Sequence, residues 1–252
     1  MKKANKKVNA AIIIIGNEIL SGRTQDVNVA SISKWFNNLG VKVEEVRVIP
    51  DLEDSIVKTI NDVRKKFKYI FTTGGIGPTH DDITSKSIAK AFKLPYGYHK
   101  EAYKILEKYY EAEKFNEGRK KMAKLPDNAL LINNPSSTAP GFIVDNVYCL
   151  PGVPSILKSM LGELNNKIVG GKKILSKTIN LKTIESEIAL PLGKIQKKFN
   201  NTEIGSYPFI KRGKVGVSIV IRSTEKNLIN KCSNEIKKFI KKKRLKFWKG
   251  NN

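Results

Sequence analysis

Residues 69–84 read YIFTTGGIGPTHDDIT, and this stretch decides which fold the chain can adopt. A short apolar run, Tyr69–Phe71, leads through two threonines into the glycine-rich segment 74–78, and a helical pattern begins near Ile83. This order predicts a buried strand, a glycine turn and a helix start. Glycines let the backbone approach a ligand closely, and the free N–H groups of a helix start favour an anion. We therefore expect a phosphate-like ligand at this turn.

Two carboxylates, Asp81 and Asp82, stand directly before the predicted helix. They would repel a phosphate unless a divalent cation lay between them, so the stretch suggests a metal-bridged phosphate or diphosphate. The simpler interpretation makes Asp82 the N-cap of the helix from Ile83 and lets Asp81 complement the helix dipole. We expect the cap role for Asp82, and for Asp81 both interpretations stay open.

Strands and helices alternate on both sides of this stretch. The patterns predict strands at 9–16, 41–49, 69–71 and 147–150, and helices at 29–39, 52–67, 83–92, 99–124 and 156–164. Such alternation indicates βαβ units and a largely parallel sheet, in which binding sites lie beyond the carboxyl ends of the strands. The loops at 16–22, 74–82 and 151–155 follow such ends, so we expect them to share a pocket. A further loop rich in hydroxyl groups is expected at 133–142.

The character of the chain changes at 170–171, where two glycines stand together. Beyond them we predict strands at 174–181, 204–210 and 215–223 and helices at 185–199 and 225–243. The sequence therefore predicts two domains, a larger one at 1–172 and a small α+β domain at 173–252.

The positive charge is concentrated in the second domain. The chain has a net charge of +24, and residues 171–252 hold 21 Lys and Arg against 5 Asp and Glu. A basic face can bind nucleic acid, but Lys greatly outnumbers Arg, and bidentate recognition of bases or phosphates would favour Arg. We therefore interpret the excess as a lysine-rich solvated surface and do not expect nucleic acid as a partner.

Other features point to a cytoplasmic protein. Cys149 and Cys232 match no metal or redox spacing, which fits buried thiols in a reducing compartment. The basic and then apolar start, residues 1–16, resembles a signal peptide superficially but is interpreted as the first buried strand. No apolar run approaches the roughly 20 residues of a membrane span.

Five segments together resemble the CinA family, competence/damage-inducible protein A: GNEILSG at 16–22 with Asn28, TTGGIGPTHDDIT at 72–84, NPSSTAPGF at 134–142, LPGVPS at 150–155 and TIESEI at 183–188. The resemblance implies a three-layer α/β/α domain of the MoaB/Mog, molybdopterin-binding type over 1–172 and a KH-like α+β domain over 173–252. It further implies metal-dependent hydrolysis of the diphosphate in ADP-ribose or a related dinucleotide. The cofactor would be a divalent metal, Mg²⁺ or a transition metal, and molybdopterin is the alternative ligand.

The resemblance also implies roles for individual residues. Asp81 and Asp82 would bind the metal or position water, and Glu18 is a candidate ligand or base. Contacts to phosphate and substrate would come from Gly74, Gly75, Gly77, Thr79, Asn28, Ser137, Thr138 and Gly152.

The chain departs from the family pattern in three places. Ile156 stands where family members usually have a glutamate after LPGVPS. The C-terminal deamidase domain of full-length CinA proteins is not part of the resemblance, so we do not predict that activity. The KH-like segment lacks the GxxG loop that clamps nucleic acid, which favours packing or homo-oligomer formation as its role.

Two alternatives to hydrolysis stay open at this point. The first is a protein of molybdenum-cofactor synthesis that binds or adenylylates a pterin. The second is a non-enzymatic nucleic-acid binder acting through the basic C-terminal domain.

Overall fold

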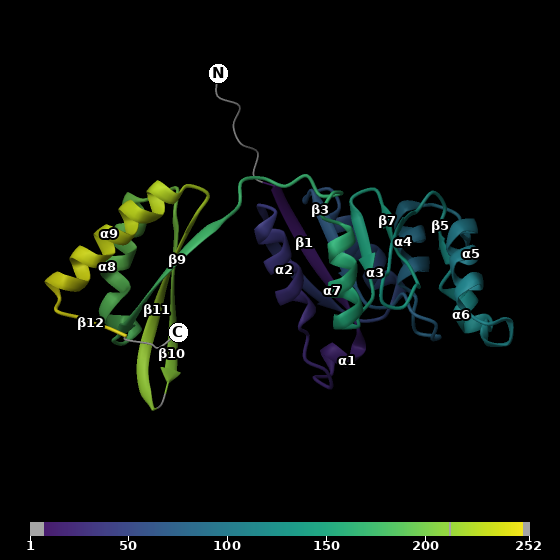
Figure 1. Cartoon of the computed structure of the whole chain (residues 1–252), viewed down its shortest axis with the longest axis horizontal. Coiled ribbons are helices and arrows are strands. Elements are labelled where there is room, and N and C mark those ends of the chain that lie inside the picture. The colour runs from purple at the N-terminus through teal and green to yellow at the C-terminus, as the bar shows by residue number, and fades with distance from the viewer. Residues whose placement is uncertain (1–7, 212, 249–252) are drawn as a thin grey trace, which may run out of the picture. The chain divides into compact units, whose positions relative to one another are not determined.

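The protein is described by a computed structural model, in which residues 8–211 and 213–248 are placed (Figure 1). The chain divides into two compact units, Met1–Gly171 and Lys172–Asn252, and each is described by itself. Among the placed residues no helix combines the length and the apolar character that crossing a membrane requires.

The first unit is built on a six-stranded, mostly parallel sheet, as predicted (Figure 1). The parallel part, in the order β2-β1-β3-β8, consists of β1 (Val8–Ile15), β2 (Val41–Ile49), β3 (Tyr69–Thr73) and β8 (Val147–Leu150). Two antiparallel strands that we did not predict, β7 (Gly141–Val144) and β6 (Leu130–Ile132), extend the sheet beyond β8. Since β6 runs parallel to β8, the ends of β1, β3, β8 and β6 lie at one edge.

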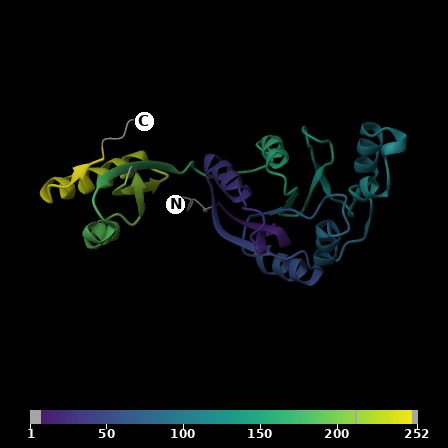
Figure 2. The same ribbon diagram turned by 90° about the horizontal axis from the view of Figure 1, so that it is seen from below.

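Helices cover both faces of this sheet, which makes the predicted three layers (Figure 2). One face packs against α2 (Asn28–Asn38) and α7 (Pro154–Glu163), and the other against α3 (Glu53–Val63), α4 (Thr84–Phe92) and α5 (Lys100–Tyr109). Within β1, Ile12 belongs to the apolar cluster on the face covered by α2 and α7. Its neighbour Ile13 belongs to the cluster on the face covered by α3, α4 and α5. An unbroken isoleucine run is therefore what a parallel strand buried on both faces requires.

The single helix predicted at 99–124 is wrong. The helix α5 ends at Tyr109, because the backbone of its C-cap Tyr110 is extended. It is followed by the 3₁₀ turn η1 (Ala112–Lys114) and by α6 (Glu117–Lys121). Asn116 starts α6 anew, because its Oδ1 accepts a hydrogen bond from Arg119 N at 3.1 Å. The short strands β4 (Tyr96–Tyr98) and β5 (Lys124–Pro126) then pair at the base of this excursion.

The second unit has the order β9 (Leu175–Lys182), α8 (Glu185–Lys198), β10 (Glu203–Lys211), β11 (Lys214–Ser223), α9 (Lys226–Lys242) and β12 (Lys246–Phe247). Its sheet is antiparallel in the order β10-β11-β9-β12. The three longer strands and both helices confirm the predicted small α+β domain. The strand β12 was not predicted, because two residues carry no pattern.

Candidate functional site

The glycine turn after β3 is closed tightly on both of its sides. Gly74 and Gly75 have φ values of 100° and 68°, a region that favours glycine. Thr84 N donates to Gly75 O at 2.9 Å, and Thr84 Oγ1 donates to Gly74 O at 3.0 Å. A Cβ at Gly74 would overlap Ile15 O at the end of β1, and a Cβ at Gly75 would overlap the Thr84 hydroxyl. The turn is therefore fixed between the end of β1 and the start of α4.

The two aspartates that follow serve their own turn and not the helix. The helix α4 begins at Thr84, with Ile83 as an N-cap that makes no side-chain hydrogen bond. The expected N-cap role of Asp82 is therefore wrong. Its Oδ2 instead accepts a hydrogen bond from Thr79 N at 2.8 Å, because the chain folds back over residues 79–82.

The hydroxyl of Thr79 brings both carboxylates together. Thr79 Oγ1 lies 2.6 Å from Asp81 Oδ1 and also within hydrogen-bonding distance of Asp82 Oδ2. A hydroxyl has one proton to donate, so it can bond to only one of these two carboxylate oxygens at a time. Gly77 makes room for this arrangement, because a Cβ there would lie 2.7 Å from Asp82 Oδ2.

A further carboxylate that we did not predict, Asp51, joins Glu18, Asp81 and Asp82 in this group. It follows β2, and its Oδ2 accepts a hydrogen bond from Asn17 N at 2.8 Å. Burial raises its pKa, the hydrogen bond from Asn17 opposes this rise, and the charges of Glu18, Asp81 and Asp82 raise the pKa further. The acidic side chains of the loop at 16–22, the end of β2 and the turn at 79–82 therefore influence one another electrostatically. We call Glu18, Asp51, Asp81 and Asp82 the carboxylate field. An acid directly after a predicted strand was the signal that could have identified Asp51.

The pKa of Asp81 shifts in the opposite direction. The hydrogen bond from Thr79 lowers it most, and the charges of His80 and Lys121 lower it further. Lys121 comes from α6, and its Nζ donates to Thr79 O. Asp81 is therefore an exposed carboxylate with a lowered pKa, whereas the pKa of Asp51 is raised.

Asn28 joins the glycine turn from the other side. It starts α2, is 4% exposed, and its Nδ2 donates to Gly152 O at 2.7 Å. Its Oδ1 is buried and has no hydrogen-bond partner among the placed residues. A Cβ at Gly152 would lie 3.5 Å from Gly74 Cα, so Asn28, Gly152 and the turn are neighbours. An unpaired buried amide oxygen is the kind of group that a bound ligand satisfies.

Ser137 and Thr138 lie at the same edge of the sheet, in the loop that joins β6 to β7. The loop is organised by Asn134, a buried residue that we did not single out. Its Oδ1 accepts from Ser137 N at 3.1 Å, and its Nδ2 donates to Ala139 O at 2.7 Å. Thr138 adopts a left-handed φ of 65°. The hydrogen bonds found for this loop stay within it or reach α7, so none ties Ser137 or Thr138 to the glycine turn.

The carboxylates suit an ion that is shared with a substrate rather than a closed metal cage. Over residues 8–211 and 213–248 there is no group of three or more His, Cys, Asp or Glu side chains placed to hold a metal. Mg²⁺ commonly binds through one or two carboxylates together with substrate phosphates and water. Asp81 and Asp82 could offer two carboxylates from one turn, and the Asp81 side chain is 62% exposed. The residues therefore fit such an ion.

Comparison with known proteins places this chain in a family. Residues 11–170 match the family described as "Probable molybdopterin binding domain", and residues 173–247 match "FAD synthase, middle domain". A protein from Archaeoglobus fulgidus is 32% identical over 233 residues, which cover 92% of this chain and 98% of that protein. A putative competence-damage inducible protein from Clostridium botulinum is 31% identical over 229 residues, covering 86% of this chain. The chain spans 55% of the length of that relative.

A solved structure leads to the same group. The crystal structure of the protein CinA from Thermoplasma acidophilum, described as having unknown function, is 33% identical and superposes with a TM-score of 0.60. The matched region covers 65% of this chain and 99% of the Thermoplasma acidophilum chain. The first unit is thus a domain of the molybdopterin-binding type. Together with its named relatives, this shows that the chain belongs to the CinA family.

The turn at Gly75 provides a test of this geometry. We expect Gly75→Ala to reduce the free energy of unfolding by more than Gly22→Ala. Both glycines have a left-handed φ, 68° and 72°, so both variants carry the cost of about 1 kcal/mol for alanine there. Only the Gly75 variant also forces a Cβ against Thr84, since a Cβ at Gly22 would have nothing within 4 Å. Urea unfolding measures both, and equal losses would contradict the closed turn.

Asp51 provides a second test, through pH. Its pKa is raised above the usual 3.8, so its ionisation costs the folded state stability at neutral pH and none once it is protonated. Asp51→Asn keeps an acceptor for Asn17 N, and we expect it to melt at a higher temperature than the wild type at pH 7. The difference in melting temperature between Asp51→Asn and the wild type should disappear near pH 3, where Asp51 is protonated. Asp145→Asn, at the β7–β8 turn on the opposite edge, is the control. A lower melting temperature for Asp51→Asn at pH 7 would show that the hydrogen bond from Asn17 to the ionised carboxylate outweighs the cost of its burial and the repulsion from Glu18, Asp81 and Asp82.

Proposed function

We propose that the first unit hydrolyses the diphosphate of a nucleotide such as ADP-ribose or a related dinucleotide, with the help of a divalent metal ion. The observation that carries the proposal is the position of the glycine turn. It lies beside the field of four carboxylates and beside the unpaired amide oxygen of Asn28. A diphosphate needs closely approaching backbone and a cation between itself and carboxylates, and the remainder of a nucleotide needs polar groups that orient it.

Each part of the site has a role in this proposal. The backbone of Gly74, Gly75 and Gly77 would contact phosphate oxygens, and Asn28 Oδ1 would accept a hydrogen bond from a hydroxyl or amine of the nucleotide. Asp81 and Asp82 would hold the cation. A divalent ion bound there neutralises the diphosphate and lowers the pKa of a water molecule.

The proton of the attacking water needs an acceptor. Glu18 and Asp51 are the two candidates, because both lie in the carboxylate field and neither shares the Thr79 hydroxyl. Asp51 has the raised pKa that suits a general base better than an ordinary aspartate. Ile156 cannot supply this role. Its side chain packs against the apolar cluster between the sheet and α7, so the family's usual glutamate position contributes no polar group here.

A second candidate function is binding or adenylylation of molybdopterin. It is favoured by the description of the matched family over residues 11–170. The same glycine turn would then take the phosphate of the pterin, and the carboxylates would hold the ion of an adenylyl donor. This candidate differs from the first in its ligand and not in the residues that it uses.

Hydrolysis is tested with ADP-ribose, FAD, NAD and ATP, each with and without Mg²⁺, Mn²⁺ or Co²⁺. We expect release of AMP that requires the metal ion and that falls about 10- to 100-fold in Asp81→Asn and in Asp82→Asn. Both variants keep an oxygen that can accept from Thr79, which limits the damage to the turn. Asp145→Asn removes the same charge at the opposite edge of the sheet and should keep full activity.

Two outcomes would redirect the proposal. Absence of metal-dependent release from all four nucleotides by folded protein would contradict hydrolysis. A fluorescent pterin that copurifies with the protein, and that binds more weakly to Gly75→Ala, would then support the second candidate.

A further inference from the structure

The sheet of the second unit has two unlike faces. One face packs on α8 and α9 through an apolar cluster that includes Ile179 of β9 and Ile219 of β11. Successive residues of a strand point to opposite faces, so Asn180 and Ser218 lie on the other face. Their Oδ1 and Oγ atoms are 2.8 Å apart. The face away from the helices therefore carries polar side chains in the middle of the sheet.

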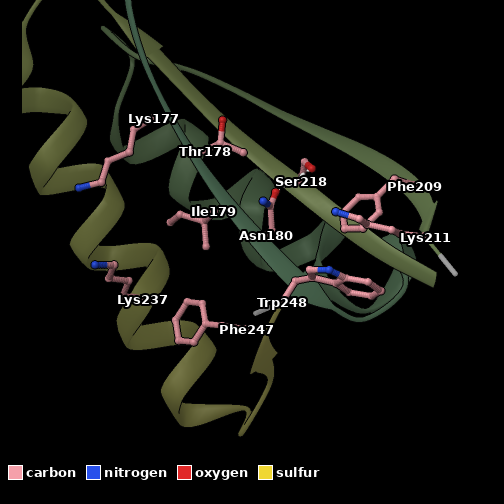
Figure 3. Close-up of a pocket in the computed structure, with 10 residues that line it drawn as sticks. All are labelled: Lys177, Thr178, Ile179, Asn180, Phe209, Lys211, Ser218, Lys237, Phe247 and Trp248. Atoms are coloured by element: carbon pink, nitrogen blue, oxygen red, sulfur yellow. Dashed lines mark hydrogen bonds between the residues drawn. The ribbon is translucent and has the colours of Figure 1, made fainter. Parts of the chain in front are cut away.

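A hollow of about 740 Å³ lies along the edge of β9, and its lining includes side chains of the polar face and Lys237 of α9 (Figure 3). Within the described part of the chain, the strand β12 pairs with β9 at Lys182 and Leu181, and the earlier residues of β9 line the hollow. The lining side chains are lysines, aromatic residues and small polar or apolar residues: Lys177, Thr178, Ile179, Asn180, Phe209, Lys211, Ser218, Lys237, Phe247 and Trp248. No carboxylate is among them.

Two aromatic rings, one from each edge of the sheet, meet in this hollow. Phe209 of β10 and Trp248, which follows β12, have ring centroids 5.1 Å apart in an edge-to-face arrangement. Gly216 makes this meeting possible, because it is the partner of Phe209 in the register and a Cβ there would lie 2.5 Å from the Phe209 ring. Trp248 is held in place by its backbone, whose N donates to Asn180 O at 2.8 Å. The rings are therefore positioned side chains and not a frayed end.

The cations of the hollow are spread out, and no acidic partner of theirs is found among the described residues. Lys177 and Lys237 lie on the side of α9, and Lys211 lies on the side of β10 (Figure 3). None of the ion pairs found over residues 8–211 and 213–248 includes any of these three lysines. Lys177 Nζ makes only a long contact of 3.4 Å with Asn230 Oδ1. Among the residues that the structure describes, the lining of the hollow thus carries several separate positive charges and no negative one.

We propose that this hollow binds single-stranded nucleic acid. Bases stack on Phe209 and Trp248, and successive phosphates contact Lys177, Lys211 and Lys237. Proteins hold unpaired strands without reading their sequence by placing aromatic rings beside a row of cations. Such binding needs positive charge and no bidentate contact, so lysine is sufficient for it. A free nucleotide carries its phosphates at one point, whereas these lysines lie on two sides of the hollow. The inference does not depend on the proposed hydrolysis in the first unit.

Phosphate contact is tested by the salt dependence of binding. Anisotropy of a labelled single-stranded 12-mer is measured with the full chain between 50 and 200 mM salt. The pair Lys211→Gln and Lys237→Gln is compared with Lys194→Gln and Lys197→Gln, two exposed lysines of α8 that do not line the hollow. Each phosphate contact contributes about 0.7 to the slope of log K against log salt. We expect the slope to fall by about 1.4 in the first pair and to stay unchanged in the second.

Stacking is tested with the protein's own tryptophans. The chain has two, Trp35 and Trp248, so Trp35→Phe leaves Trp248 as the reporter in the hollow. We expect the oligonucleotide to quench its fluorescence, and Phe209→Leu and Trp248→Leu to weaken binding at least about fivefold in anisotropy. Leucine keeps apolar bulk at both positions, and thermal melting confirms that each variant is folded.

Four results would overturn the proposal. The first is equal salt slopes for the two lysine pairs, and the second is binding without a change in Trp248 fluorescence. The third is displacement of the 12-mer by AMP when the AMP concentration equals the 12-mer concentration counted in nucleotides. This would indicate a site for a free nucleotide. The fourth is a poly-glutamate peptide that binds as tightly as the 12-mer, which would indicate a site for acidic protein segments.

Discussion

The first unit depends on the closure of Gly74 and Gly75 against Thr84. Both carbonyl groups of the turn receive hydrogen bonds from this one threonine, whose side chain is fully buried at the start of α4. The left-handed turn therefore cannot shift without breaking the start of the helix. The same closure brings β3, β1 and the loop at Gly152 together, because the turn touches Ile15 on one side and Gly152 on the other. The candidate site is a consequence of this one constraint.

Periodicity was sufficient to predict most of the fold. Buried parallel strands and amphipathic helices of ten or more residues have strong patterns, and β1, β2, β3 and the helices beside them were predicted within a few residues. The strands β6 and β7 were missed because three or four residues are too few for a pattern. The prediction of one helix at 99–124 was wrong because the polar and apolar pattern continues through the break between α5 and α6. Phe115 lies in this break and is buried in the core.

The site was predictable in its loops and less so in its partners. Turn-forming residues after strands located the segments around Glu18, Gly74 and Gly152, since strand ends in a parallel sheet share an edge. Asp51 was missed because it reads as the start of a helix, and only the fold brings it near Asp81. The role of Asp82 was wrong because a carboxylate can serve Thr79 N as well as a helix start. In the second unit, Phe209 and Trp248 are 39 positions apart in the chain, so charge alone was visible there.

The place of β8 in the sheet has a consequence for the order in which the first unit folds. On one side β8 pairs with β7 across a short turn, Val144 opposite Val147. On its other side it pairs with β3, where Ile70 is opposite Val147 and 77 positions away from it. Closing the long connection costs more chain entropy than closing the short one, so the hairpin can form early while the parallel pairing waits. The glycine turn gains its neighbour Gly152 only through that late pairing. The candidate site is therefore complete only once this long-range pairing has formed.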